Sequence, residues 1–320
     1  MTKPVAIVRN KADPSESTYV DWNLGTLCNY ACSYCPEGLH NGKWKWPAID
    51  VALDFCERVI AHYGALGRRT TFKLTGGEPT LYKHLIELLS RIKTLGGRTG
   101  VNSNGGRELE WWERAAPHLD FAVLTHHVEF TDTEHFVMVA RHLLEHGIDV
   151  HVNVTMLPQR FDECVNNVRT VMSKCDGLTM ALKPLLIDFG ERLYPYDDEQ
   201  RLLMQRFSLD PTDEPSGGIR CLYEDGTSAV FEPQDLLLRD ENHWRSWNCN
   251  AGLESLAVHA DGQVFRAVCK EQGPIGSLRS AQLCLPTSPK RCGKGTCSCL
   301  ADIKISKWRG NDSAPGFVAG

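Results

Sequence analysis

Short apolar stretches of strand length alternate with segments of helical periodicity over the first two thirds of the chain. In Lys83–Leu95, leucines and isoleucines recur every three or four residues, and Asp132–His146 and Phe161–Lys174 follow the same spacing. The predicted strands are Thr18–Leu24, Thr70–Leu74, Arg98–Ser103, Phe121–His126, Asp149–Met156 and Leu178–Leu185. This alternation predicts parallel strands joined by right-handed crossovers.

The fold class that follows is α/β, a partial (β/α)6 TIM-like barrel over residues 18–210. In folds of this kind, ligands bind beyond the carboxyl ends of the strands. We therefore expect the functional residues to lie in the loops that follow the predicted strands.

The pattern changes after about residue 210. A linker rich in Pro and Gly, 211–218, precedes two predicted β-hairpins, each with an Asp-Gly turn. The hairpin strands are Ile219–Glu224 with Thr227–Glu232, and Leu253–His259 with Gln263–Val268. We expect an N-terminal segment (1–17), the barrel (18–210), a linker with a hairpin (211–244), a small cysteine-rich domain (245–305) and a tail (306–320).

Composition is that of an ordinary globular protein. The chain has 320 residues, 42% hydrophobic and 23% charged, with a net charge of −5. The negative charge argues against a nucleic-acid partner. No apolar run is long enough to cross a membrane, and residues 1–17 lack the apolar core of a signal peptide. We expect a cytoplasmic protein that binds neither membrane nor nucleic acid.

The thirteen cysteines change this picture because most of them are grouped. Three lie at positions 28–35 and three at 292–299, with two more upstream of the second group. In a chain without a signal peptide, such grouping indicates metal or redox chemistry rather than disulfides. The isolated cysteines are interpreted as small apolar side chains: Cys56, Cys164, Cys175, Cys221 and Cys284.

The first group, Cys28, Cys32 and Cys35, has the spacing C-x3-C-x2-C directly after the first predicted strand. Three thiolates can hold three corners of a [4Fe–4S] cluster. The fourth iron then lacks a protein ligand, and such an open position is typical of a site that binds a substrate or cofactor. A zinc site is the alternative, but it normally needs a fourth ligand, for which His40 is the nearest candidate.

A second motif, Thr75–Thr80, follows the second predicted strand with the sequence Thr-Gly-Gly-Glu-Pro-Thr. Its glycines allow close approach of the backbone to a ligand. Together the two motifs resemble the radical S-adenosylmethionine (SAM) superfamily. The resemblance implies that the open iron binds SAM and that a 5′-deoxyadenosyl radical abstracts hydrogen from a substrate.

The resemblance also implies which residues bind SAM. Tyr34 would lie near the adenine, and the second motif would receive the SAM ammonium. Polar residues near later strand ends would bind the ribose and the methionine carboxylate, although ordinary turn and cap residues are an equally good interpretation for those. The implied set is Tyr34, Gly76, Gly77, Glu78, Pro79, Asn102, Ser103, Asn104 and Asn153.

The second cysteine group resembles the SPASM/twitch extension of radical SAM enzymes. Its members are Cys249, Cys269, Cys292, Cys297 and Cys299. The resemblance implies an auxiliary [4Fe–4S] cluster, and five cysteines suit the shorter twitch form. Four ligands leave one cysteine over, either a spare thiol or a hydrogen-atom donor, for which Cys249 is our candidate. A zinc site would satisfy the same residues.

Two further residues are candidates for chemistry on the substrate. His127 follows the fourth strand, where a histidine can bind substrate or move a proton. Because neighbouring residues of a strand face opposite ways, at most one of His126 and His127 should point inward. Lys183 lies late in the sixth strand and faces either the interior or solvent.

The sequence says less about the substrate. Acidic residues after the sixth strand could receive a cationic molecule, or they could form a solvated loop: Asp188, Glu191, Asp197 and Asp198, with Tyr194 among them. Trp44 and Trp46 could stack on a substrate or anchor the cysteine loop.

Three functions remain open. The first is oxidation or epimerisation of a C–H centre in a polar small molecule, such as an aminosugar or cyclitol. The second is modification of a peptide, which we favour less because fewer than 20 residues precede the first predicted strand. The third is a non-catalytic iron–sulfur or zinc protein. For an enzyme, the resemblance implies a flavodoxin- or ferredoxin-type electron donor.

Overall fold

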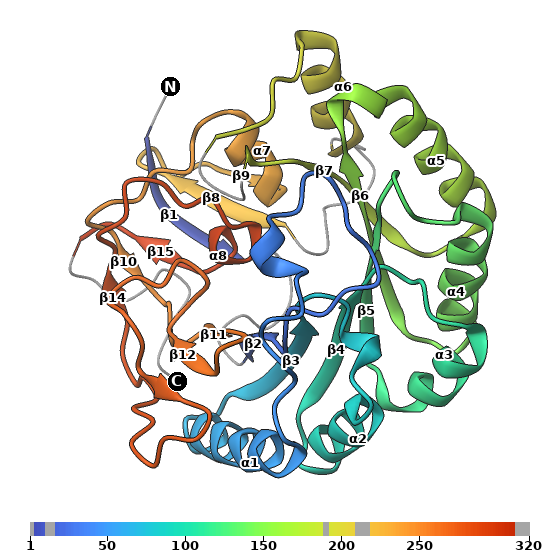
Figure 1. The fold of residues 1–320 in the computed structure, drawn as a ribbon. Helices are drawn as coiled ribbons and strands as arrows, with labels where there is room; N and C mark the ends of the chain where they lie inside the picture. The colour runs from blue at the N-terminus through green and yellow to red at the C-terminus, as the bar shows by residue number, and fades with distance from the viewer. Residues whose placement is uncertain (1–2, 10–16, 188–191, 209–217, 311–320) are drawn as a thin grey trace.

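The computed structural model describes residues 3–9, 17–187, 192–208 and 218–310, and within them the chain forms two β-sheets (Figure 1). The larger sheet has nine strands. In spatial order they are β13 (Gly276–Ser277), β12 (Gln263–Phe265), β11 (Ser255–Val258), β2 (Ser17–Asn23), β3 (Arg69–Thr75), β4 (Arg98–Ser103), β5 (Phe121–His126), β6 (Asp149–Met156) and β7 (Thr179–Pro184).

Strands β2 to β7 are parallel and lie side by side in chain order, which confirms the predicted partial barrel. Figure 1 shows the helices along the outer side of this curved sheet. They are α1 (Ile49–Ala65), α2 (Leu85–Thr94), α3 (Leu109–Ala115), α4 (Thr133–Glu145), α5 (Phe161–Lys174) and α6 (Asp198–Ser208). Short 3-10 turns lie in the connections: η1 (Glu37–Leu39), η2 (Pro79–Leu81), η3 (Ala116–His118) and η4 (Pro158–Arg160).

Alternation along the parallel strands separates an apolar face from a polar one. Trp22 on β2 and Phe72 on β3 are fully buried in the main hydrophobic core, on the side of the helices. Asp21 and Lys73 are their neighbours in sequence, so they point to the opposite side, which we call the inner face. The side chain of Asp21 is 12% exposed and that of Lys73 is 26% exposed.

The second hairpin extends the barrel sheet. Strand β11 pairs with β2 in parallel, with Leu256 opposite Val20, and β12 continues the sheet in antiparallel fashion. The predicted 245–305 segment therefore shares its sheet with the barrel. This arrangement brings the C-terminal cysteines beside the first barrel strand. The local sequence pattern did not predict that proximity.

The smaller sheet joins both ends of the chain. Its strands, in spatial order, are β14 (Lys290–Arg291), β10 (Asn248–Cys249), β15 (Lys307–Trp308), β1 (Pro4–Arg9), β8 (Ile219–Tyr223) and β9 (Ser228–Phe231). Strands β8 and β9 form the first predicted hairpin. The remaining helices are α7 (Pro233–Leu238) and α8 (Leu300–Ile303).

Two sequence predictions need correction here. The predicted tail begins too early, because Lys307 and Trp308 are buried and β15 pairs with β1 and β10. The predicted N-terminal segment contributes β1, which lies between β15 and β8. The linker 211–217 and residues 311–320 lie outside the described residues. Among the residues that are described, no helix has the length and apolar character needed to span a bilayer.

Candidate active site

The loop after β2 carries the first cysteine group, and we call residues 27–35 the cysteine loop. The Cys35 amide donates to the Cys32 carbonyl over 3.0 Å, and the Tyr30 amide lies 3.4 Å from the Cys28 sulfur. Cys32 is buried, whereas Cys28 and Cys35 are half-buried. All thirteen cysteines lie within the described residues and are free thiols. The three side chains of the loop are thus available as ligands.

Hydrogen bonds from the loops after three other strands hold the cysteine loop in place. Asn104, after β4, donates from Nδ2 to the Asn29 side chain over 2.8 Å. Glu129, after β5, accepts both the amide and the hydroxyl of Ser33, over 2.7 and 2.6 Å. The Glu78 amide, after β3, donates to the Leu27 carbonyl over 2.8 Å. The loop is therefore positioned by the carboxyl ends of the neighbouring strands.

The two glycines of the second motif allow its close contact with the cysteine loop. Gly76 and Gly77 have φ of +97° and +52°, a region that favours glycine. A Cβ at Gly77 would lie 2.1 Å from the Leu27 carbonyl oxygen, and one at Gly76 would lie 1.9 Å from Oδ1 of Asn23. Their lack of a side chain therefore permits packing of one loop on the other. Pro79 follows as a buried residue of η2.

The Glu78 carboxylate joins the loops after β3 and β4. Its Oε1 accepts the amide and hydroxyl of Thr80 and the hydroxyl of Ser103, and Oε2 accepts the Asn104 amide. These four bonds measure between 2.7 and 3.0 Å, and the side chain is 1% exposed. Burial raises the pKa of this carboxyl, while the four donors oppose that rise. The geometry gives Glu78 a role in fixing both loops.

Tyr34 connects the cysteine loop to β5 and β6. Its hydroxyl lies 2.6 Å from Nδ1 of His127 and 2.9 Å from Oγ1 of Thr155. The Tyr34 and His127 rings are stacked, with centroids 6.0 Å apart. Burial raises the pKa of the Tyr34 hydroxyl above its usual range, so Tyr34 is a neutral hydrogen-bonding group at neutral pH.

The two adjacent histidines point in different directions. His126 is fully buried, bonds Oγ1 of Thr133 through Nε2 and packs against Phe136 of α4. His127 turns towards Tyr34 of the cysteine loop. Burial lowers the pKa of His126 to about 4 and that of His127 to about 3. His127 is therefore a neutral ring at pH 7.

The three cysteines suit an iron–sulfur cluster better than a single ion. Burial raises the pKa of Cys28, and it raises that of Cys32 to about 12 and that of Cys35 to about 11, so cluster binding would release protons. A structural zinc ion normally needs a fourth protein ligand in addition to three thiolates. A cubane binds each cysteine through a different iron, so its ligands spread around it.

The inner face next to this loop is polar. Its polar residues are Asp21, Asn23, Lys73, Thr75, Asn102, Thr125, His151, Asn153, Thr155 and Lys183. Asn102 bonds Thr75 over 3.3 Å and Thr125 over 3.1 Å, across three neighbouring strands. Lys73 and Asp21 form an ion pair. The sequence analysis did not single out Asp21 and Lys73 as site residues. The signal that could have identified them is a charged residue inside a strand whose neighbouring positions are apolar.

The second cysteine group lies on the other side of β2. Cys249, on β10, packs with Cys269 and Cys292 around Ala251, Ala267 and Ile305. Burial raises the pKa of the Cys297 thiol, and Cys249 and Cys299 are close enough to add to that rise. Cys299 lies towards the barrel, since Asp21 and Lys73 both act on its pKa, which burial raises to about 12. The five cysteines therefore form one group, with Cys299 nearest the inner face.

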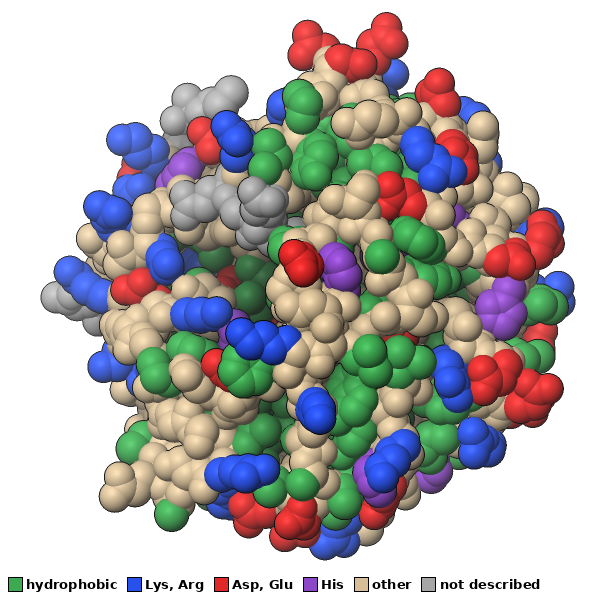
Figure 2. Space-filling model, in the orientation of Figure 1, with side chains coloured by type: hydrophobic (Ala, Val, Ile, Leu, Met, Phe, Trp, Pro, Cys, Tyr) green, Lys and Arg blue, Asp and Glu red, His purple; other side chains and the backbone are tan. Residues whose placement is uncertain are grey.

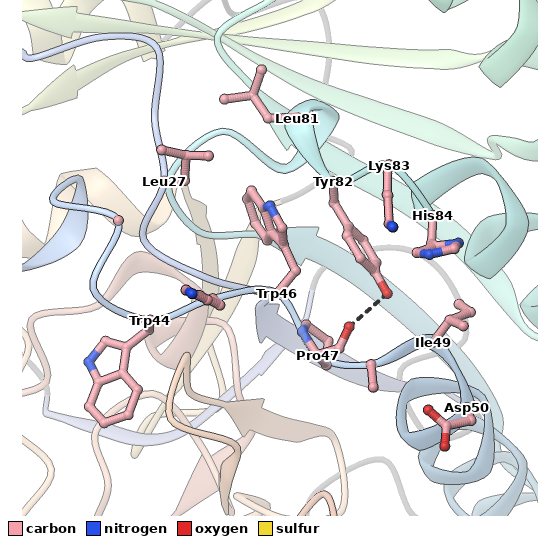
Figure 3. A pocket seen from close by; sticks show the side chains of 13 residues that line it. Leu27, Trp44, Trp46, Pro47, Ile49, Asp50, Leu81, Tyr82, Lys83 and His84 are labelled. Carbon is pink, nitrogen blue, oxygen red and sulfur yellow. Dashed lines mark hydrogen bonds between the residues drawn. The ribbon is translucent and has the colours of Figure 1, made fainter.

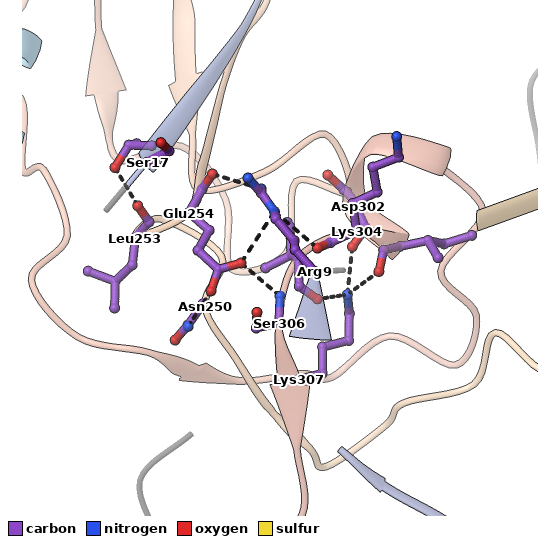
Figure 4. Close-up of polar contacts among 12 residues, drawn as sticks. Arg9, Ser17, Asn250, Leu253, Glu254, Asp302, Lys304, Ser306 and Lys307 are labelled. Atoms are coloured by element: carbon purple, nitrogen blue, oxygen red, sulfur yellow. Dashed lines mark hydrogen bonds and ion pairs between the residues drawn. The ribbon is translucent and has the colours of Figure 1, made fainter. Parts of the chain in front are cut away.

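Two buried charged residues frame this group, and sequence reasoning missed both. The Asp302 carboxylate accepts the amides of Val268 and Cys269 over 3.1 and 2.6 Å. The Lys307 ammonium donates to the carbonyls of Asp302, Ile303 and Ile305 at the end of α8 (Figure 4). These contacts fix the backbone of the Cys269 loop relative to α8.

A pocket of about 750 Å³ lies outside the barrel, beside the second motif (Figure 3). Its walls include Leu27, Trp44, Trp46 and Tyr82. The Trp46 ring packs at 5.7 Å from Tyr82, whose hydroxyl donates to the Pro47 carbonyl over 2.9 Å. Trp46 thus anchors the segment after the cysteine loop, whereas Trp44 is 43% exposed.

The acidic segment after β7 is only partly described. Asp188 and Glu191 lie outside the described residues. Asp197 accepts the Gln200 amide over 2.8 Å at the start of α6, and Asp198 is exposed. Tyr194 is half-buried and packs against the main core. Of the described residues of this segment, Asp197 thus stabilises the start of α6 and Tyr194 packs on the core.

In space-filling view, a shaded recess separates the region of η1 from the C-terminal segments (Figure 2). Charged side chains of both signs surround it.

Comparison with known proteins agrees with this geometry. The profile of the Radical SAM superfamily matches residues 22–171, from β2 into α5. The GTP 3′,8-cyclase of Mannheimia succiniciproducens is 31% identical over 106 residues, which are 31% of this chain and 31% of that protein. YfkA of Bacillus subtilis is 24% identical over 241 residues, covering 71% of this chain and 60% of that protein. The chain thus spans about a third of the length of the cyclase.

Solved structures share the fold at low sequence identity. Native anSMEcpe with bound AdoMet and Kp18Cys peptide gives a TM-score of 0.56 at 14% identity, over 83% of this chain and 79% of that one. Streptococcus suis SuiB bound to S-adenosylmethionine gives 0.51 at 16% identity, over 84% of this chain and 65% of that one. These likenesses concern the arrangement of the elements.

Proposed function

Because the chain belongs to the radical SAM superfamily, we propose that it removes a hydrogen atom from a C–H centre of a polar small molecule, such as an aminosugar or cyclitol, and so oxidises or epimerises it. The enzyme uses SAM and a [4Fe–4S] cluster, which together supply a 5′-deoxyadenosyl radical. Peptide modification remains the alternative. The proposal is carried by the polar inner face between the two cysteine groups.

The inner face suits a small molecule with several hydroxyl groups. Asn102, Thr125 and Asn153 offer donors and acceptors from adjacent strands, and His151 bonds Thr179 over 2.8 Å. A polar substrate replaces its bonds to water with bonds to such groups, which fixes its orientation. His127 is uncharged at neutral pH, so it would act as a hydrogen-bonding group or accept a proton.

We propose that Cys28, Cys32 and Cys35 bind the cluster and that SAM lies against the neighbouring loops. The proposed SAM residues are Tyr34, Gly76, Gly77, Glu78, Pro79, Asn102, Ser103, Asn104 and Asn153. All except Asn153 come from the cysteine loop or from β3, β4 and the loops after them, which bond to one another. Because the Glu78 carboxylate already accepts four bonds, we assign the SAM ammonium to backbone carbonyls of the motif.

We further propose an auxiliary [4Fe–4S] cluster held by four of the five C-terminal cysteines: Cys249, Cys269, Cys292, Cys297 and Cys299. Their grouping supports this, and Cys249, Cys269 and Cys292 share one packed cluster. Anaerobic reconstitution should then give about eight irons per chain, about four for each cubane. A count near four, with zinc bound, would exclude the second cluster.

Release of 5′-deoxyadenosine tests the enzyme directly. We expect it when the reconstituted protein is incubated with SAM and dithionite, and we expect none from the Cys28→Ala, Cys32→Ala, Cys35→Ala triple variant. If the wild-type protein releases none with any candidate substrate, the proposed function is wrong. A flavodoxin or ferredoxin, proposed as the natural electron donor, should replace dithionite.

Deuterium separates oxidation from epimerisation. A thiol exchanges its hydrogen with solvent, so an epimerase that returns hydrogen from a cysteine will place deuterium from D2O in its product. Oxidation will leave none at that carbon. Cys249→Ser and Cys299→Ser should be compared, because Cys249 is our sequence candidate and Cys299 lies nearer the inner face.

A further inference from the structure

The charged residues of the inner face are not balanced. Asp21 is paired with Lys73, so its carboxylate is already neutralised. Lys183, on β7, is half-buried, and its ammonium has no hydrogen bond or ion pair with any residue that the structure describes. A buried ammonium without a partner is costly, because it loses water and gains nothing in exchange.

Lys183 points to the inner face and not to the helices. Its neighbours Leu182 and Pro184 are buried, and Leu182 belongs to the main core, so alternation directs Lys183 to the opposite side. In register it lies opposite Thr155 of β6, which bonds Tyr34 of the cysteine loop. The ammonium therefore projects at the level of the strand ends near the cysteine loop.

The groups around Lys183 come from different elements of the fold. His127, His151 and Lys73 are close enough to interact with its charge, and so is Cys299 of the second cysteine group. Burial and Lys73 both lower the pKa of Lys183. An anion bound there would oppose both effects, since it favours the charged ammonium.

We propose that the substrate carries an anionic group, a carboxylate or a phosphate, and that the Lys183 ammonium binds it. This inference rests on the proposed function and narrows its substrate class from polar small molecules in general to anionic ones, so a simple cationic aminosugar is no longer among the expected substrates. It makes Lys183 a binding residue that fixes the substrate between the cysteine loop and Cys299, instead of a group that takes part in proton transfer.

The same face offers little to a cationic group. Among the described residues of the face, Asp21 supplies a carboxylate, and Lys73 already occupies it. Nearby, the Lys304 ammonium forms no hydrogen bond with described residues, and Figure 4 shows its side chain directed away from the bonded network. The charge of Glu232 acts on Lys304, and Asp21 pairs with Lys73. No carboxylate of the described residues is among the groups that act on Lys183, so its ammonium is the one that favours an anion.

A different explanation is that Lys183 balances the negative charge of an auxiliary cluster near Cys299. The two explanations predict different losses on substitution. If Lys183 serves the cluster, removing its charge will change iron content or the cluster spectrum. If Lys183 binds substrate, removal will change anion affinity and leave both cluster properties intact.

The test uses the reconstituted enzyme with SAM, anaerobic and without reductant, in calorimetric titrations. The probes are glucose, glucosamine, glucuronate and glucose 6-phosphate, so the two anions separate a carboxylate site from a phosphate site. We expect one anionic sugar to bind about tenfold or more tightly than glucose and glucosamine. Lys183→Met should remove this preference, and Lys183→Arg should keep it. Lys174→Met, at an exposed lysine paired with Glu134, is the control and should change nothing.

A second measurement covers the case in which Lys183→Met fails to fold. In the wild-type enzyme, the preferred anionic sugar should protect Lys183 from acetylation, as measured by mass spectrometry, whereas glucose should not. The inference is overturned if no probe is preferred, if glucosamine is preferred, or if Lys183→Met retains the preference. It is also overturned if that variant loses iron while its anion affinity stays the same.

The two proposals can fail separately. Release of 5′-deoxyadenosine together with no anion preference overturns the substrate class alone. Absence of 5′-deoxyadenosine under every condition overturns the proposed function, even where the anion preference is observed.

Discussion

The Tyr34 hydroxyl lies 2.6 Å from Nδ1 of His127, and this contact connects the cysteine loop to the end of β5. Thr155 of β6 meets the same hydroxyl over 2.9 Å. The position of the three cysteines therefore depends on two strands that are distant in sequence. Since the three partners are largely buried, breaking the contact leaves polar groups without water to replace it.

Tyr34→Phe should destabilise the protein by about 1–3 kcal/mol, because Nδ1 of His127 and the Thr155 hydroxyl both lose a partner. Anaerobic urea denaturation of the reconstituted protein measures the change. Tyr223→Phe is the matched control, since its hydroxyl makes no side-chain hydrogen bond within the described chain, and its effect should stay within about 0.5 kcal/mol. Equal midpoints for the two variants would contradict the structural role of Tyr34.

Gly77→Ala should prevent the second motif from packing on the cysteine loop. The new Cβ would lie 2.1 Å from the Leu27 carbonyl oxygen, a contact that backbone movement alone can relieve. Gly147→Ala separates the effect of backbone strain from that of the close contact. Gly147 also has a positive φ, +72°, but a Cβ there would meet open space. We expect a loss of about 1 kcal/mol for Gly147→Ala and a larger loss for Gly77→Ala, with reduced iron content. Similar losses in both variants would show that the close contact is unimportant.

Stability should fall as pH drops from about 6.5 to about 4. Burial lowers the pKa of His126 from 6.5 to about 4, so the unfolded chain binds a proton in this range that the folded chain does not. His126 thus contributes stability above pH 6.5 that is progressively lost on acidification, by about 3 kcal/mol in all. His127 and His151 act in the same direction.

The variant His126→Gln checks this effect, because it removes the titrating ring. Urea denaturation at a series of pH values should give a smaller decline in unfolding free energy for the variant than for the wild-type protein. If both proteins lose stability with the same slope, His126 does not contribute to the pH dependence.

Asp302→Asn should release the Cys269 loop. The amide oxygen of asparagine can accept one backbone amide, but its NH2 group opposes the other, so one of the bonds to Val268 and Cys269 is lost. We expect a destabilisation of about 2 kcal/mol and a lower iron content, with 5′-deoxyadenosine release retained. Asp261→Asn is the control, at an exposed hairpin turn where Asp261 accepts the Gln263 amide over 2.9 Å. A full complement of iron in Asp302→Asn would contradict this assignment.

Local pattern was sufficient for the elements of the barrel. Buried strands and helices of period 3.6 were recognisable because each buries one continuous face, and α5 was predicted to the residue. Long-range pairing was not recognisable. Strands β1 and β15 are short and lie at opposite ends of the chain, and their partners are distant residues that no local pattern specifies. Because this pairing could not be recognised, the predicted tail (306–320) begins before the end of the folded chain.

The sequence by itself was sufficient to predict the chemistry of the first site, because C-x3-C-x2-C and the Gly-Gly-Glu-Pro motif are local and their spacing indicates a cluster. Only the tertiary structure decided which side chains meet. It turned His127 towards Tyr34 and His126 towards α4, placed Cys299 rather than Cys249 nearest the inner face, and left Lys183 without a carboxylate among the described residues. The physical reason is that strand register and sheet order set these neighbours, and both depend on packing between distant segments.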